Sequence, residues 1–166
     1  MNILYCGDKP MQKGILLSSM SLIKNVDEPL NIYILTVDYR EKGINYKPVD
    51  KAFAKYLEEK LNKSDIKVNV FLVDVTRYFV EELPEANMQS RFTACCMLRL
   101  FADKTDIKDR VLYLDTDVLC RKDFRDFYYQ NMDGIEIAGV SDYYGRWFFG
   151  DGYINSGVML MNMNMI

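Results

Sequence analysis

Short apolar runs along the chain alternate with longer stretches in which apolar residues recur at helical spacing. Such runs, bounded by turn residues, are typical of strands buried in a sheet. The expected strands are 2–6 (NILYC), 30–37 (LNIYILTV), 66–75 (IKVNVFLVDV), 110–115 (RVLYLD), 135–142 (IEIAGVSD) and 153–163 (YINSGVMLMNM).

The segments between these runs have the spacing of helices. They are 10–25, 50–63, 76–83 and 90–104. Pro10 suits the first turn of a helix, where its missing N–H has no intrahelical partner to lose. In the second segment Phe53, Leu57 and Leu61 recur every four residues, which places them on one helical face. Ser90 is a suitable N-cap for the last helix.

This alternation predicts the fold class. Strands separated by helices indicate a single α/β domain with a mostly parallel sheet, and 166 residues are enough for one buried core. In such sheets, ligands bind beyond the carboxyl ends of the strands. The chain stops within an apolar run, GVMLMNMNMI, so we expect a fragment or a chain that is short relative to its relatives.

Composition and charge narrow the range of partners. Hydrophobic residues make up 49% of the chain and charged residues 27%, which is typical of a globular protein. The formal charge of -3 gives no electrostatic basis for binding nucleic acid or an anionic membrane. The apolar runs are too short for a signal peptide or a transmembrane segment, although peripheral membrane association stays open.

The cysteines and the lack of histidine bear on the chemistry. Cys6, Cys95, Cys96 and Cys120 lie in apolar surroundings without a C-x-x-C pair, which favours buried, reduced thiols and a cytoplasmic location. The chain has no histidine. Ser-His and Cys-His catalysis and His-dependent zinc sites are therefore excluded, and any chemistry must depend mainly on Asp, Glu, Lys, Arg or Tyr.

The run VLYLDTDVLC places two aspartates, Asp115 and Asp117, among aliphatic residues. Residues two apart on a strand point to the same side, about 7 Å apart along the backbone. At a strand's carboxyl end, the two carboxylates are suited to share Mg²⁺ or Mn²⁺, which would neutralise a bound diphosphate and help it depart. The alternative is that Asp115 caps a turn and Asp117 is solvated.

The haloacid-dehalogenase phosphatases also place D-x-D after an apolar strand. Their motif continues as D-x-D-x-T/V and opens the domain, whereas here Leu119 occupies the fifth position, more than a hundred residues into the chain. A phosphatase is therefore disfavoured.

Four segments in collinear order resemble glycosyltransferase family 8, with its galactosyltransferase and glycogenin-like members: NILYCGDK, LRLF, RVLYLDTDVLCRKDFRDFY and GYINSGVMLMNM. The resemblance covers essentially the whole chain, and its most specific pieces are YLDTDVL and INSGVMLMN. It implies a GT-A fold, which is the Rossmann-like fold of nucleotide-diphospho-sugar transferases. It also implies a retaining transfer of a hexosyl unit from a UDP-sugar donor to an acceptor hydroxyl on a saccharide or glycoconjugate.

The resemblance implies a metal and donor site, residue by residue. Asp115 and Asp117 match the family's DxD motif, which binds Mn²⁺ (or Mg²⁺) and the donor diphosphate. Asp115 and the backbone of Thr116 would also reach the ribose.

Other matched positions surround the nucleotide. Asp8 matches an aspartate near the uracil, with Cys6 and Gly7 offering backbone groups, although Asp8 is equally suited to cap a helix. Arg99 matches an arginine that holds the donor sugar region, or it pairs with a structural carboxylate.

The sugar side of the site is implied less specifically. Asp142 and Asn155 match positions that line the sugar pocket and are candidate catalytic residues, yet both residue types also favour turns. The residue that assists the retaining step is not identified. Residues 141–157 place six aromatic residues among four glycines, which favours an acceptor-side loop or, alternatively, a plain core hairpin.

The resemblance is incomplete beyond the last expected strand. Family members continue with an acidic-glutamine segment, a histidine that is the third protein ligand of the metal, and a Gly and Lys cluster on the diphosphate. Without them we expect weak metal binding, and the alternative function is a non-catalytic nucleotide-sugar-binding module. A nucleotidyltransferase is disfavoured, because the sequence shows no glycine- and arginine-rich triphosphate loop.

Overall fold

The computed structural model describes residues 1–41, 43–82 and 94–166. Its strands are β1 (Asn2–Cys6), β2 (Leu30–Thr36), β3 (Val68–Asp74), β4 (Arg110–Leu114), β5 (Ile137–Ser141) and β6 (Ile154–Asn162). Its helices are α1 (Gln12–Ile23), α2 (Lys51–Leu61), α3 (Thr76–Glu81), α5 (Arg125–Tyr128) and α6 (Gly145–Phe149), with the 3-10 helices η1 (Lys9–Met11) and η2 (Ala94–Lys104). Every predicted strand is confirmed, to within two residues at each end.

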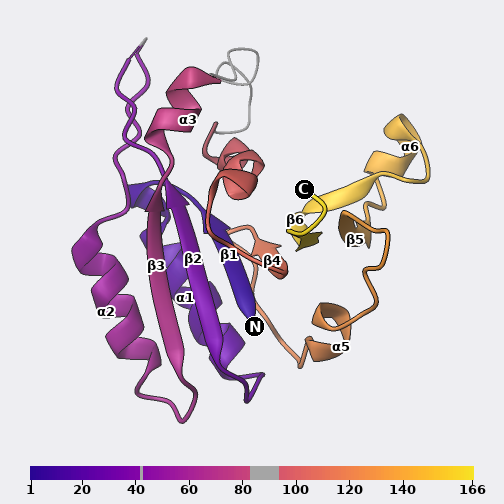
Figure 1. The fold of residues 1–166 in the computed structure, drawn as a ribbon, viewed down its shortest axis with the longest axis horizontal. Helices are drawn as coiled ribbons and strands as arrows, with labels where there is room; N and C mark the ends of the chain where they lie inside the picture. Colours follow the sequence, from indigo (N-terminus) through magenta and orange to yellow (C-terminus); the bar gives the residue numbers. More distant parts are fainter. Residues whose placement is uncertain (42, 83–93) are drawn as a thin grey trace.

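The strands form one sheet in the order β3-β2-β1-β4-β6-β5 (Figure 1). β1 is parallel to both β2 and β4, and β2 is parallel to β3. β6 is antiparallel to both of its neighbours, β4 and β5. The predicted α/β architecture with a mostly parallel sheet is therefore confirmed, and the antiparallel pairs are confined to one side of it.

The predicted helices are observed with two changes. Pro10 lies in η1, and α1 follows directly and ends at Ile23, so the first helix begins with a tighter turn. α2 buries Leu57 and Leu61, as their four-residue spacing predicts. The last predicted α-helix is, over its described part, the 3-10 helix η2, and the expected cap Ser90 lies outside the described residues.

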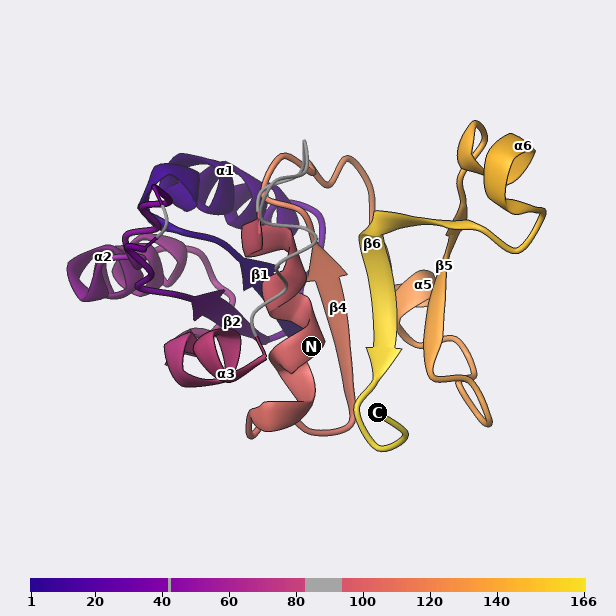
Figure 2. The same ribbon diagram turned by 90° about the horizontal axis from the view of Figure 1, so that it is seen from above.

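Helices cover both faces of the parallel part of the sheet. Figure 2 shows α1 and α2 on one side of β1 and β2, and α3 with η2 on the other. Alternate residues of β1 point into two cores: Ile3 and Tyr5 into the first, Leu4 and Cys6 into the second. Burial on both faces explains why the parallel strands are continuous apolar runs rather than alternating ones.

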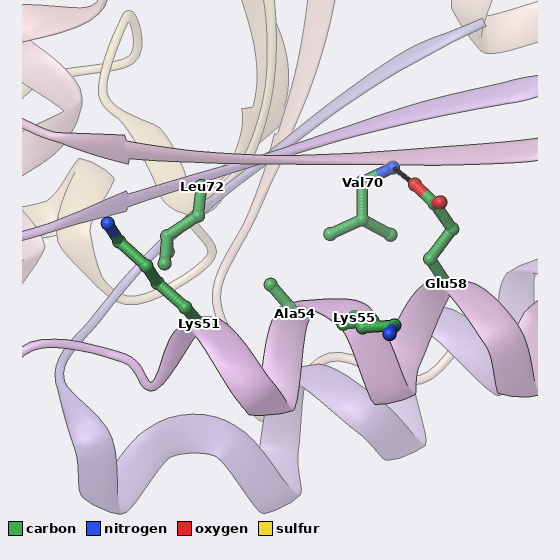
Figure 3. Close-up of a pocket in the computed structure, with 6 residues that line it drawn as sticks. All are labelled: Lys51, Ala54, Lys55, Glu58, Val70 and Leu72. Carbon is green, nitrogen blue, oxygen red and sulfur yellow. Dashed lines mark hydrogen bonds between the residues drawn. The ribbon is translucent and has the colours of Figure 1, made fainter.

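The edge strand β3 is protected by side chains of α2 and the turn after it. Glu58 Oε2 accepts a hydrogen bond from the N–H of Val70 at 2.7 Å, above a hollow of about 350 Å³ between α2 and β3 (Figure 3). Asn62 accepts from the N–H of Val68 at 3.0 Å and donates to its carbonyl at 2.6 Å. These bonds occupy outward-facing backbone groups that would otherwise invite pairing with another chain.

The four cysteines are free thiols. Cys6 and Cys95 are buried, as predicted, whereas Cys96 and Cys120 are only half-buried. Within the three described ranges, no helix has both the length and the apolar character needed to cross a membrane.

Candidate functional site

The two aspartates of the D-x-D motif lie in a turn beyond the end of β4, not on the strand itself. The N–H of Asp115 donates to the carbonyl of Gly157 in β6 at 2.8 Å, and the N–H of Val118 donates to the carbonyl of Asp115 at 3.1 Å. The prediction that strand geometry aligns the two side chains is therefore wrong, because the chain turns immediately after Leu114. The predicted location at the carboxyl end of the strand is confirmed.

Both aspartates nevertheless line one hollow of about 200 Å³. Its walls are Cys6, Met11, Cys96, Tyr113, Asp115, Thr116 and Asp117. Cys6 ends β1, and Asp115 follows β4, so the hollow lies at the carboxyl ends of two adjacent parallel strands. β1 connects to β2 on one side and pairs with β4 on the other, which is the kind of switch point where α/β sheets bind ligands.

The carboxylate of Asp115 is held by two neighbours. Its Oδ1 accepts a hydrogen bond from Tyr113 Oη at 2.6 Å and lies 3.9 Å from Arg99 Nη1. The Arg99 guanidinium lies over the Tyr113 ring, 4.9 Å from its centroid, and donates to the carbonyl of Ser156 at 2.8 Å. Burial raises the pKa of Tyr113, so this phenol stays protonated and remains a donor to Asp115. Arg99 thus joins η2, β4 and β6 around one carboxylate.

Two glycines allow the D-x-D turn to pack closely. A Cβ at Gly157 would lie 2.9 Å from Asp115 Oδ2, and a Cβ at Gly14 in α1 would lie 2.5 Å from the carbonyl oxygen of Thr116. Sequence reasoning missed Gly14, although a glycine inside a helical segment is unfavourable and signals a close approach. The glycines leave room for the turn between α1 and β6.

Asp8 is buried directly after the strand that supplies Cys6. Only 7% of Asp8 is exposed, and it occupies the N-cap position of η1 without a side-chain capping hydrogen bond. The alternative that its carboxylate caps the helix is therefore wrong. Burial raises the pKa of this carboxyl group. The N–H of Gly7 donates to the carbonyl of Leu35 at 3.0 Å, so that backbone donor is used within the sheet.

Asp142 and Asn155 meet beside a second hollow of about 390 Å³, which both help to line. Asp142 Oδ1 accepts from the N–H groups of Tyr144 at 3.0 Å and Gly145 at 2.6 Å, so its role as a turn residue is confirmed. Asn155 Nδ2 donates to Asp142 Oδ2 at 3.3 Å, and Asn155 Oδ1 accepts from the N–H of Gly157 at 2.9 Å. Because Gly157 also binds the backbone of Asp115, one short strand segment connects the two hollows.

The aromatic segment between β5 and β6 projects from the sheet (Figure 2). Its six aromatic side chains are all exposed, up to 83% for Phe148, so the alternative of a plain core hairpin is wrong. The aromatic residues are Tyr143, Tyr144, Trp147, Phe148, Phe149 and Tyr153. Two of them, Tyr143 and Tyr144, also line the second hollow.

The carboxylate oxygens of Asp115 and Asp117, at the hollow of about 200 Å³, suit a hard divalent cation. Asp115 Oδ1 is engaged by Tyr113, whereas Oδ2 has no hydrogen-bond partner among the described residues, and Asp117 is exposed. Carboxylate oxygens are the ligands that Mg²⁺ and Mn²⁺ prefer, with water and phosphate oxygens completing the shell. In the ranges that the structure describes, no group of three or more Asp, Glu, Cys or His side chains is placed to hold a metal, so those ranges supply at most this pair.

Two bacterial relatives have similar sequences. The chain is 26% identical over 157 residues to the glycosyltransferase GlyA of Streptococcus pneumoniae serotype 4, covering 86% of this chain and 18% of that protein. It is 26% identical over 108 residues to the probable glycosyl transferase Gly of Streptococcus gordonii, covering 65% of this chain and 15% of that protein. The chain thus spans less than a fifth of the length of these relatives.

Solved structures share the fold. The galactosyltransferase LgtC, crystallised with donor and acceptor sugar analogues, matches with a TM-score of 0.77 at 20% identity, over 98% of this chain and 58% of that one. The glycosyltransferase GlyE of Streptococcus pneumoniae TIGR4 matches with a TM-score of 0.69 at 20% identity, over 98% of this chain and 34% of that one. These similarities confirm the predicted GT-A fold. The family model for glycosyl transferase family 8 matches residues 2–165, and the chain therefore belongs to that family.

Proposed function

We propose that this chain forms the donor-binding part of a retaining glycosyltransferase that moves a hexosyl unit from a UDP-sugar to an acceptor hydroxyl. The observation that supports it best is that Asp115 and Asp117 line one hollow at the switch point of a family 8 chain, with Arg99 Nη1 3.9 Å from Asp115 Oδ1. The site combines a carboxylate pair for a cation with a nearby guanidinium, which together suit a diphosphate.

Asp115 and Asp117 would hold Mn²⁺ or Mg²⁺ in this proposal. The bound cation supplies charge neutralisation for the diphosphate and so assists the departure of UDP. Tyr113 and Arg99 orient the Asp115 carboxylate through their contacts to Oδ1. Asp8, next to Cys6, would face the uracil.

The sugar and the acceptor are assigned to the second hollow and its surroundings. Asp142 and Asn155 are already oriented toward each other, and both have polar groups that suit sugar hydroxyls. The exposed aromatic rings of the segment between β5 and β6, called the α6 segment below, suit the apolar faces of an acceptor saccharide. The acceptor hydroxyl attacks from the face that UDP leaves, which retains the anomeric configuration.

A second candidate is a nucleotide-sugar-binding module without turnover. It is favoured by one specific observation: within the described residues the protein offers two metal carboxylates and no third ligand group. A cation held by two protein carboxylates depends more strongly on the diphosphate for its remaining ligands than a cation with three protein ligands does.

Calorimetry with UDP and Mn²⁺, together with UDP release from UDP-sugars, separates these candidates. Binding with turnover supports the transferase, and binding without turnover supports the module. Asp117→Asn removes one charge with little change of shape and should abolish Mn²⁺-dependent UDP binding in either case. Asp133→Asn, at an exposed carboxylate away from the hollow, is the matched control and should bind like the wild type. Unchanged Mn²⁺-dependent affinity in Asp117→Asn would contradict the proposal.

A further inference from the structure

The two carboxylate oxygens of Asp115 have different surroundings. Oδ1 accepts a hydrogen bond from Tyr113 Oη at 2.6 Å and lies 3.9 Å from Arg99 Nη1. Within the ranges that the structure describes, Oδ2 accepts no hydrogen bond, and its close neighbour Gly157 has no side chain to cover it. This carboxylate therefore presents one engaged oxygen and one open oxygen.

The groups at the engaged oxygen are themselves fixed by packing. Tyr113 is 2% exposed in the middle of the sheet, where it pairs with Leu4 of β1 and Met159 of β6. The Arg99 side chain is 15% exposed, and it is held by the Ser156 carbonyl at 2.8 Å and by the Tyr113 ring. A cation at the engaged oxygen would have to displace the hydroxyl and approach a guanidinium of like charge.

Divalent cations differ in how many oxygens they take from a protein. Ca²⁺ accepts about six to eight oxygen ligands and often binds both oxygens of one carboxylate. Mg²⁺ demands an octahedron of about six ligands and keeps several waters, and Mn²⁺ also suits an octahedral oxygen shell. A carboxylate with one engaged oxygen therefore suits Mg²⁺ and Mn²⁺ better than it suits Ca²⁺.

We infer that Tyr113 is a positioning residue that determines cation specificity, because its hydroxyl makes the pair of Asp115 and Asp117 favour Mg²⁺ and Mn²⁺ over Ca²⁺. The hydroxyl engages Oδ1, so Asp115 offers only Oδ2 to a cation. Tyr113 acts through Asp115 and does not itself bind the cation. The inference rests on the part of the proposed function that assigns a cation to these two aspartates.

The test measures cation binding by the whole chain without nucleotide. Electron paramagnetic resonance follows free Mn²⁺, whose sharp signal is lost on binding, so a Mn²⁺ titration gives the Kd of Mn²⁺. Displacement of bound Mn²⁺ by Ca²⁺ then gives the Kd of Ca²⁺. The wild type should bind Mn²⁺ more tightly than Ca²⁺. In Tyr113→Phe the ratio of the Ca²⁺ Kd to the Mn²⁺ Kd should fall about tenfold, because partners of a metal ligand typically change metal affinity by about that factor or more.

Tyr5→Phe is the matched control. Tyr5 is a fully buried tyrosine of β1, and its Oη donates to Ser18 Oγ at 2.8 Å in the first core. This variant loses the same hydroxyl and one hydrogen bond, but it should keep the wild-type ratio of the two Kd values. Circular dichroism compares the folding of both variants. Should Tyr113→Phe fail to fold, the two Kd values of the wild type still test the inference.

Three results would overturn the inference. They are a wild type that binds Ca²⁺ as tightly as Mn²⁺ or binds neither, an unchanged ratio in Tyr113→Phe, and an equal change of the ratio in Tyr5→Phe. Calorimetry with UDP tests the proposed function separately. A chain that shows the expected change of ratio but binds no UDP would keep the cation specificity and lose the donor assignment.

Discussion

At the scale of single residues, the site depends on glycines as much as on charged side chains. The D-x-D turn lies between α1 and β6, where Gly14 and Gly157 leave no room for a side chain. This arrangement leaves Oδ2 of Asp115 without a hydrogen-bond partner among the described residues, while Oδ1 accepts a hydrogen bond from Tyr113. We therefore expect these two glycines to influence binding through the position of the Asp115 carboxylate.

Gly157→Ala should weaken Mn²⁺-dependent UDP binding by about tenfold or more, equivalent to about 1.4 kcal/mol. The new Cβ would lie 2.9 Å from Asp115 Oδ2 and would displace the oxygen that is open to a cation. Gly152→Ala is the matched control, because a Cβ there meets nothing within 4 Å. Equal UDP affinity of the two variants by calorimetry would show that the close approach at Gly157 is unimportant for binding.

Asp8 should make the stability of the chain depend on pH. Burial raises the pKa of its carboxyl group above the usual 3.8, so the ionised form destabilises the folded state. The stabilising effect of protonation is complete below 3.8 and is lost as the pH rises through the folded-state pKa. Asp8→Asn should therefore be more stable than the wild type at neutral pH, and this advantage should vanish in acid.

Urea unfolding at several pH values measures this difference. Asp133→Asn, at an exposed carboxylate, should show no comparable gain at neutral pH. A gain for Asp8→Asn that is the same in acid as at neutral pH would contradict burial of the charge as its cause.

At the scale of elements, the two edges of the sheet are built differently. The β3 edge is closed by Glu58, which binds the N–H of Val70 (Figure 3), and by Asn62, which binds the N–H of Val68. Along the β5 edge, no described side chain binds the outward-facing backbone groups in this way, and Ile137 and Val140 are exposed. The periodicity of its apolar residues predicted α2. The hydrogen bond of Glu58 to the strand edge could not be predicted in this way, because it depends on where the helix packs.

Glu58→Ala should lower the free energy of unfolding by about 1–2 kcal/mol, because the part-buried N–H of Val70 loses its acceptor. Glu59→Ala is the matched control one residue along. Among the described residues, Glu59 forms an exposed ion pair with Lys55 at 3.8 Å and no other ion pair, so its replacement should change the stability by no more than about 0.5 kcal/mol. Chemical denaturation measures both, and equal losses would contradict the role assigned to Glu58.

At the scale of the whole molecule, the buried cores that stabilise the fold and the exposed aromatic surface lie in different parts of the structure. The two cores lie mainly around the parallel strands and their helices and extend onto β6, whereas the α6 segment projects away from the sheet (Figures 1 and 2). α5 and α6 were not predicted, because helices of four and five residues are too short to show a helical period. Their positions depend on the strands that flank them.

The double substitution Trp147→Ser and Phe148→Ser should leave the free energy of unfolding within about 0.5 kcal/mol of the wild type, because both rings are mostly solvent-exposed. Phe79→Ala, at a fully buried ring of the second core, should cost about 3–5 kcal/mol. Urea unfolding followed by circular dichroism gives both values. A large loss for the exposed pair would mean that the α6 segment packs against other parts of the chain.

The sequence by itself determined the order of strands and main helices, the α/β class and the location of the D-x-D motif at a strand end. These features depend on local periodicity, since two-sided burial makes parallel strands continuously apolar and helix burial imposes a four-residue spacing. The tertiary structure alone decided that the aspartates occupy a turn, and that Arg99, Tyr113, Gly14 and Gly157 surround it. Those residues come from separate elements, and they meet only because β4 pairs with β1 on one side and with β6 on the other.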